Sequence, residues 1–111
     1  MRSEGRRLMN RLREIADRPG MFLSNPSYDG LCSFIEGFDY ACEGKVLAAF
    51  RKWLVEQNAP TNLGWSSGFL YSLFASDEDP IARIKKSSAD DKLAINKLVE
   101  AFGKVLERES D

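Results

Sequence analysis

Apolar residues recur along this chain three and four positions apart, with polar residues between them, which is the spacing of one face of an α-helix. Leu8, Leu12 and Ile15 give the first such pattern, so we expect an amphipathic helix over residues 3–17. The Pro-Gly pair at residues 19–20 should end this helix, because proline cannot continue it.

A broader apolar stripe predicts a second helix after Ser27, whose hydroxyl is suited to accept a backbone N–H at the helix start. The stripe consists of Tyr28, Leu31, Phe34, Ile35, Phe38 and Cys42. Gly44 permits a break, and a third helix is expected to follow it and to end at the Asn-Ala-Pro sequence of residues 58–60. The apolar residues of the third helix are Val46, Leu47, Phe50, Trp53 and Leu54.

Three further segments show helical spacing. Thr61 is a candidate cap for a short fourth helix, whose apolar residues are Trp65, Phe69, Leu70, Leu73 and Phe74. The Asp-Pro pair at residues 79–80 is typical of a helix start and predicts a short helix through Lys86. One of the two serines at 87–88 then precedes an apolar final helix. Because no segment alternates with a sustained period of two, the sequence predicts an all-α fold, a compact single-domain bundle of five or six helices over residues 1–111.

The turn after the first helix, RPGMFLSNPSYDG, is unusually apolar. Met21, Phe22 and Leu23 follow the Pro-Gly pair, where polar residues are more usual. Such a loop could hold a phosphate, expose an apolar lip to a partner, or tether the flanking helices. We favour the tether, in which all three side chains pack on the core and burial contributes roughly 1.5 to 3 kcal/mol for each.

The composition is that of an ordinary globular domain, with 30% charged and 43% hydrophobic residues and a net charge of −1. The charge is unevenly distributed. Residues 1–18 contain six arginines and three acidic residues, so they carry +3 and the rest of the chain −4. A solvated helix face is the favoured explanation, because no aromatic residue is interleaved with these arginines as a nucleic-acid-binding segment would require. The arginines considered for nucleic acid are Arg2, Arg6, Arg7, Arg11 and Arg13.

The two cysteines, Cys32 and Cys42, are expected to be free thiols that pack as small hydrophobic residues. Ten residues of helix would place them roughly 15 Å apart, whereas a disulfide needs Cα atoms about 5.5 Å apart. The arginine-rich N-terminal segment has no apolar signal region, and no apolar run is long enough to span a bilayer. We therefore expect a cytoplasmic protein.

The sequence offers little catalytic chemistry. It contains no histidine, which is the most common general base and metal ligand, and two distant cysteines cannot form a tetrahedral zinc site. Acidic residues cluster at predicted helix starts, where a negative charge can cap the helix and interact favourably with its dipole. We favour this interpretation over paired catalytic carboxylates. The clustered residues are Asp77, Glu78, Asp79, Asp90 and Asp91. We therefore expect no metal, no cofactor, no small-molecule substrate and no enzymatic activity.

Three short segments follow one another along the chain, and an acidic turn and an apolar final helix come after them. The segments are RPGMFL, PSYDGLCSFIEGFDYA and FRKWLVEQNAPTNLGWSSGFLYSL. Residues 34–38 match an F-x-x-G-F/Y pattern, Trp53 matches a tryptophan at a helix end, and residues 64–65 match a G-W pair. In these motifs, over residues 12–106, the chain resembles small bacterial immunity-like proteins of contact-dependent growth inhibition and other polymorphic toxin systems. The DPIARIKKSS segment and the basic first helix depart from that pattern.

The resemblance implies a cytoplasmic protein that neutralises a cognate toxin domain, such as a nuclease, by stoichiometric contact. Because nuclease toxins have basic substrate clefts, an acidic patch would steer association. On charge alone, the candidate toxin-binding residues are Asp77, Glu78, Asp79, Asp90 and Asp91. The alternatives are a helical adaptor or regulatory module that binds another protein, and a weak nucleic-acid-binding factor that uses the basic first helix. The sequence leaves the oligomeric state open.

Overall fold

The computed structural model describes residues 2–60 and 62–109, and within them the chain forms seven α-helices and no strand. They are α1 (Arg2–Asp17), α2 (Pro19–Phe22), α3 (Tyr28–Ala41), α4 (Lys45–Glu56), α5 (Trp65–Leu73), α6 (Pro80–Lys86) and α7 (Ser88–Glu109). The prediction of an all-α fold is confirmed. None of these helices has both the length and the apolar composition that crossing a bilayer would need. The candidate cap Thr61 lies outside the described residues.

The described residues contain seven helices where five or six were predicted, because α2 forms where a plain turn was expected. Pro19 takes the first helical position, which suits its fixed φ and its missing N–H. The N–H of Leu23 then donates to the carbonyl oxygen of Pro19 at 2.9 Å, closing a single turn. The Pro-Gly pair therefore ends α1 and also begins a short helix.

The side chains of α2 do not pack as the tether interpretation requires. Met21 is 68% exposed and Phe22 is 36% exposed, whereas Leu23 is half-buried against the core. Successive residues of a helix point about 100° apart, so Met21 and Phe22 face different directions, and Leu23, just after the turn, is the residue that packs on the core. The prediction that all three are buried is therefore wrong for Met21 and Phe22.

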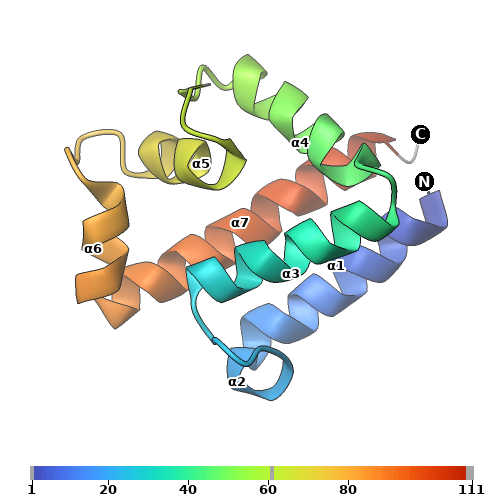
Figure 1. The fold of residues 1–111 in the computed structure, drawn as a ribbon, viewed down its shortest axis with the longest axis horizontal. Coiled ribbons are helices and arrows are strands. Elements are labelled where there is room, and N and C mark those ends of the chain that lie inside the picture. The colour runs from blue at the N-terminus through green and yellow to red at the C-terminus, as the bar shows by residue number, and fades with distance from the viewer. Residues whose placement is uncertain (1, 61, 110–111) are drawn as a thin grey trace.

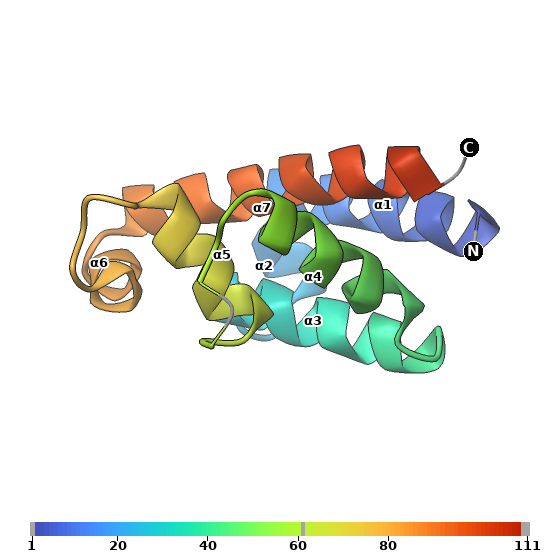
Figure 2. The ribbon, with the colours of Figure 1, turned by 90° about the horizontal axis from the view of Figure 1, so that it is seen from above.

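α1 and α7 are the longest helices and pack side by side in opposite directions, so the start of α1 and the end of α7 lie at the same end of the molecule (Figure 1). Seen from above, α1 and α7 form one layer and α3 lies in the opposite layer (Figure 2). α3 packs against α7 and α4, and α6 connects α5 to the start of α7. Direct packing between α1 and α3 is slight.

The hydrophobic core is centred on Phe50 of α4. Its ring stacks on that of Phe102 from α7, with centroids 4.1 Å apart and planes 2° apart, and Trp65 of α5 meets it edge-on at 5.8 Å. Aromatic pairs of this kind contribute about 0.5–1.5 kcal/mol beyond the burial of their surface. Other fully buried side chains come from α1, α3, α4 and α7, and they include Leu8, Leu12, Ile15, Tyr28, Leu31, Ile35, Val46 and Leu98.

The turn between α3 and α4 depends on left-handed backbone and on one buried carboxylate. Glu43 and Gly44 have φ values of 59° and 78°, and Gly44, at the N-cap position of α4, has no side chain that could cap the helix. Asp39 of α3 performs this function, because its Oδ1 accepts the N–H of Leu47 at 2.8 Å. The start of α4 is therefore fixed by α3.

Both cysteines are free thiols, as predicted. Cys32 is buried, and this burial raises the pKa of its thiol well above the ordinary value of 9.0, because the thiolate would lose its hydration. The Cys32 thiol therefore stays protonated at neutral pH.

Candidate protein-binding surface

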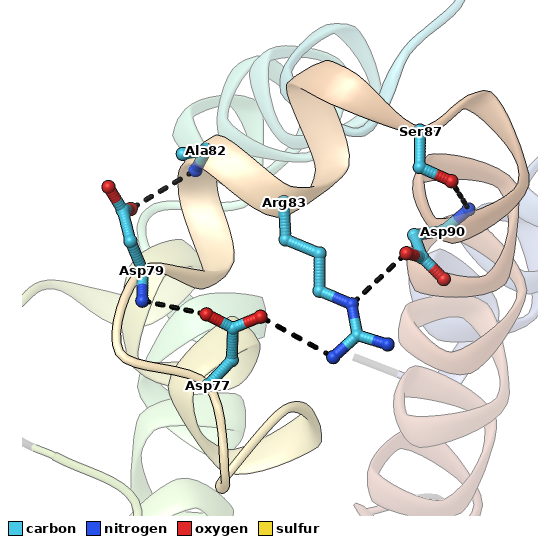
Figure 3. A network of polar contacts seen from close by, with 6 residues as sticks. All are labelled: Asp77, Asp79, Ala82, Arg83, Ser87 and Asp90. Atoms are coloured by element: carbon cyan, nitrogen blue, oxygen red, sulfur yellow. Dashed lines mark hydrogen bonds and ion pairs between the residues drawn. The ribbon is translucent and has the colours of Figure 1, made fainter.

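Two of the five acidic candidates lie around one arginine at the junction of α5, α6 and α7 (Figure 3). Arg83 donates from Nε to Asp90 Oδ2 at 3.0 Å, and its Nη1 lies 3.5 Å from Asp77 Oδ2. The guanidinium also lies over the ring of Phe74, at 4.3 Å from its centroid. Arg83 therefore connects three elements and partly neutralises two carboxylates.

The same junction contains the caps that begin α6 and α7 (Figure 3). Asp79 Oδ1 accepts the N–H of Ala82 at 3.1 Å, and Asp77 Oδ1 accepts the N–H of Asp79 at 2.9 Å. Ser87 Oγ accepts the N–H of Asp90 at 3.2 Å, which identifies Ser87 as the serine that caps α7. The prediction that these carboxylates lie at helix starts is confirmed for Asp79, which caps α6, and for Asp90, in the first turn of α7, whereas Asp77 lies in the loop before α6.

Asp91 has a different position, between the starts of two helices that are distant in sequence. Its Oδ1 accepts the N–H of Tyr28, the first residue of α3, at 3.0 Å. The hydroxyl of Tyr28 in turn donates to the carbonyl oxygen of Ser66 at 2.8 Å. Four of the five acidic candidates thus form hydrogen bonds within the chain, whereas the side chain of Glu78 is exposed.

A groove of about 390 Å³ lies between α1 and α3. α1 contributes exposed polar side chains to it, and α3 contributes two half-buried phenylalanines one helical turn apart. The lining residues are Arg7, Asn10, Arg11, Glu14, Phe34 and Phe38. A polar, arginine-bearing wall therefore faces an aromatic wall.

The exposed side chains of α2 lie beside this groove. The guanidinium of Arg11 lies over the ring of Phe22, 5.3 Å from its centroid, and Arg18 Nη1 lies 3.8 Å from Met21 Sδ. We name the combined feature the arginine–phenylalanine surface and define it as Arg7, Arg11, Met21, Phe22, Phe34 and Phe38.

The arginines of this surface keep free hydrogen-bonding and ion-pairing capacity. Arg11 pairs with Glu14 at 3.1 Å, and both side chains are about half exposed. Arg7 is exposed and has no ion pair among the residues that the structure describes. Because an exposed pair contributes only about 0–1 kcal/mol, both guanidinium groups can exchange their present neighbours for those of a partner.

A groove of about 270 Å³ lies where α4, α5 and α7 meet, and there Lys97 and Lys104 flank the half-buried residues Trp53 and Leu73, which pack against the core. Lys97 is paired with Glu100 at 3.5 Å. Within residues 2–60 and 62–109, no group of three or more His, Cys, Asp or Glu side chains is arranged to hold a metal ion.

Sequence reasoning missed the arginine–phenylalanine surface because its parts come from three helices. The arginines have no aromatic neighbours in sequence, yet the fold places Phe22, Phe34 and Phe38 beside them. One signal was available, since the apolar stripe predicted for the second helix is wider than one buried face. The buried face of α3 consists of Tyr28, Leu31, Cys32, Ile35 and Asp39, which leaves the two phenylalanines of α3 at its edge.

Comparisons of the chain with protein-family models, with curated proteins and with solved structures give no match.

Proposed function

We propose that this chain is an immunity protein, which binds a cognate bacterial toxin domain in the cytoplasm and neutralises it by stoichiometric contact, without catalysis. The observation that carries the proposal is the arginine–phenylalanine surface. Phenylalanine, methionine and arginine are the residue types enriched at protein interfaces, and arginine is also common among the residues that dominate binding energy. Met21 and Phe22 are exposed on it although both are large and apolar.

The toxin class rests on the resemblance to immunity-like proteins, and the geometry adds one point in its support. Phe34 and Phe38 are the two phenylalanines of the F-x-x-G-F pattern, and both line the groove. Both pack against the edge of the core and still present part of their rings to the groove, whereas Trp65 of the G-W pair is buried. The position of these phenylalanines therefore agrees with a binding function.

Co-expression with the toxin encoded immediately upstream of this chain's gene tests the proposal. We expect the chain to protect cells and to form a one-to-one complex with the toxin. The M21A/F22A variant should lose affinity by about tenfold or more, whereas V55A/L93A, which removes exposed apolar groups from α4 and α7, should bind as the native chain does. Failure to protect, with the toxin expressed and active, would reject the immunity function.

The acidic candidates can be tested separately. Replacing Asp77, Asp79 or Asp90 would also break helix caps or contacts with Arg83. Glu78 is exposed, so E78K reverses the charge there without removing a cap. Weaker toxin binding by E78K would support an acidic contact surface, and unchanged binding would assign the contact elsewhere.

A helical adaptor or regulatory module is the second candidate, because the arginine–phenylalanine surface is suited to any protein partner of matching chemistry. If the native chain gives no protection, and the M21A/F22A variant loses binding to another protein that the native chain binds, the chain is an adaptor.

A further inference from the structure

The groove between α1 and α3 has one wall that attracts negative charge. Arg7 and Arg11 line it together with a single acidic side chain, Glu14. Arg11 donates to Glu14 at 3.1 Å, but a guanidinium has five N–H donors, so most of its hydrogen-bonding capacity remains. Arg7 has no ion pair among the described residues, so the wall carries a net positive charge.

The opposite wall is apolar and has an unusual rim. Phe34 and Phe38 form the wall, and Gly37, one helical turn from Phe34, is exposed on the same helix next to the groove's lining residues. A Cβ at Gly37 would meet nothing within 4 Å. Glycine within a helix is less favourable than alanine by roughly 0.5–1 kcal/mol, so the packing of this chain gives no reason for it. The close approach of another backbone to α3 does give a reason.

We propose that the groove binds an acidic amphipathic helix of the partner protein, with its acidic side chains toward Arg7 and Arg11 and its apolar side chains on Phe34 and Phe38. This inference rests on the proposed function for the existence of a protein partner. A helix can lie over Gly37 closely because no side chain intervenes. A nucleic acid suits the groove less well, because only two arginines line it and one of them is already paired with Glu14, whereas a nucleic-acid site usually needs a longer basic track along the backbone.

The probe is a synthetic helical peptide of about four turns, with glutamates on one face and leucine and phenylalanine on the other. A sequence-scrambled peptide, a peptide with lysine in place of glutamate, and oligothymidylate serve as comparisons. We expect only the acidic amphipathic peptide to bind, with an affinity that falls as salt is added. Amide chemical shifts in the full chain should change around residues 7–14 and 34–38.

Matched variants separate groove binding from general charge attraction. R7E/R11E and R6E/R13E make the same change in net charge on exposed positions of α1, but the second pair lies outside the groove. The first pair should weaken binding about tenfold or more, and the second by about twofold or less. Equal weakening by both pairs, shift changes away from the groove, or tighter binding of oligothymidylate there would overturn the proposal.

Gly37 gives a second test in which folding is not at risk. G37M fills open space at an exposed position, and A48M makes a similar change on the exposed side of α4. We expect G37M to block peptide binding while A48M leaves it unchanged, with both proteins at least as stable as the native chain. Native affinity in G37M would overturn the close approach of a helix.

The two proposals fail in different ways. If the chain protects cells from the toxin and R7E/R11E and G37M protect equally well, the groove inference is wrong and the immunity function stands. If the acidic peptide binds in the groove but the chain gives no protection, the groove inference stands and the immunity function is rejected.

Discussion

Gly30 and Gly37 lie in the same helix, yet their surroundings differ. A Cβ at Gly30 would collide with the backbone carbonyl of Asn25, in the loop that leads into α3, whereas a Cβ at Gly37 would meet nothing. The first glycine is required because the loop returns against the helix that follows it. The second is not required by any contact within the described chain.

Substituting alanine at these two positions should therefore have opposite effects. We expect Gly30→Ala to lower the free energy of unfolding by about 1–3 kcal/mol, because backbone must move to accept the methyl group. Gly37→Ala should raise it by about 0.5–1 kcal/mol through the better helix propensity of alanine. Urea unfolding followed by circular dichroism measures both, and a change of the same sign in the two variants would contradict this account.

Asp39 is the buried charged residue of the core, and its carboxylate caps a helix that has no capping side chain of its own. We expect Asp39→Ala to lower the free energy of unfolding by about 1–3 kcal/mol, because the N–H of Leu47 loses its partner in a buried position. Asp39→Asn keeps an oxygen acceptor and should lose less. Urea unfolding of the two variants side by side is the measurement, and equal losses would show that the hydrogen bond is not the cause.

At the scale of the element, α2 separates two explanations of an apolar turn. If Met21 and Phe22 tethered α1 to α3, truncating both would lower stability by several kcal/mol. Because Met21 is largely exposed and Phe22 is only partly covered, we expect M21A/F22A to lower the free energy of unfolding by about 1–2 kcal/mol, mainly through Phe22, whose ring contacts Arg11. L23A should lower stability more, because Leu23 packs on the core. Thermal unfolding of the two variants distinguishes the tether from an exposed lip.

Helices set by local chemistry were predictable from the sequence, and features set by distant contacts were not. Ser27 accepts the N–H of Gly30, and Asp79 precedes a proline at the first position of α6, so both helix starts follow from neighbouring residues. The bond from Tyr28 to Asp91 joins residues 63 positions apart, and no local pattern signals it. The arginine–phenylalanine surface belongs to the second kind, since its side chains meet only after α1, α2 and α3 have packed.

At the scale of the whole molecule, the start of α3 joins several elements. Tyr28 is bonded to Asp91 at the start of α7 and to Ser66 in α5, and Cys32 lies one turn further along α3. Burial is the main cause that raises the pKa of the Tyr28 hydroxyl and of the Cys32 thiol above their ordinary values. In the folded protein, burial therefore favours the protonated form of both groups.

Stability should consequently fall in alkaline solution. In the unfolded chain Cys32 and Tyr28 lose their protons near their ordinary pKa values of 9.0 and 10.0, whereas the folded protein retains them, so the unfolded state binds fewer protons and becomes favoured as pH rises. The contribution of Cys32 is fully present below pH 9.0 and that of Tyr28 below pH 10.0, and above these values each decreases by about 1.4 kcal/mol per pH unit. Urea unfolding at neutral pH and at about pH 10 measures the loss. Cys32→Ala, which has no thiol to ionise, should lose less stability over the same interval, and a loss equal to that of the native chain would show that the buried thiol is not responsible.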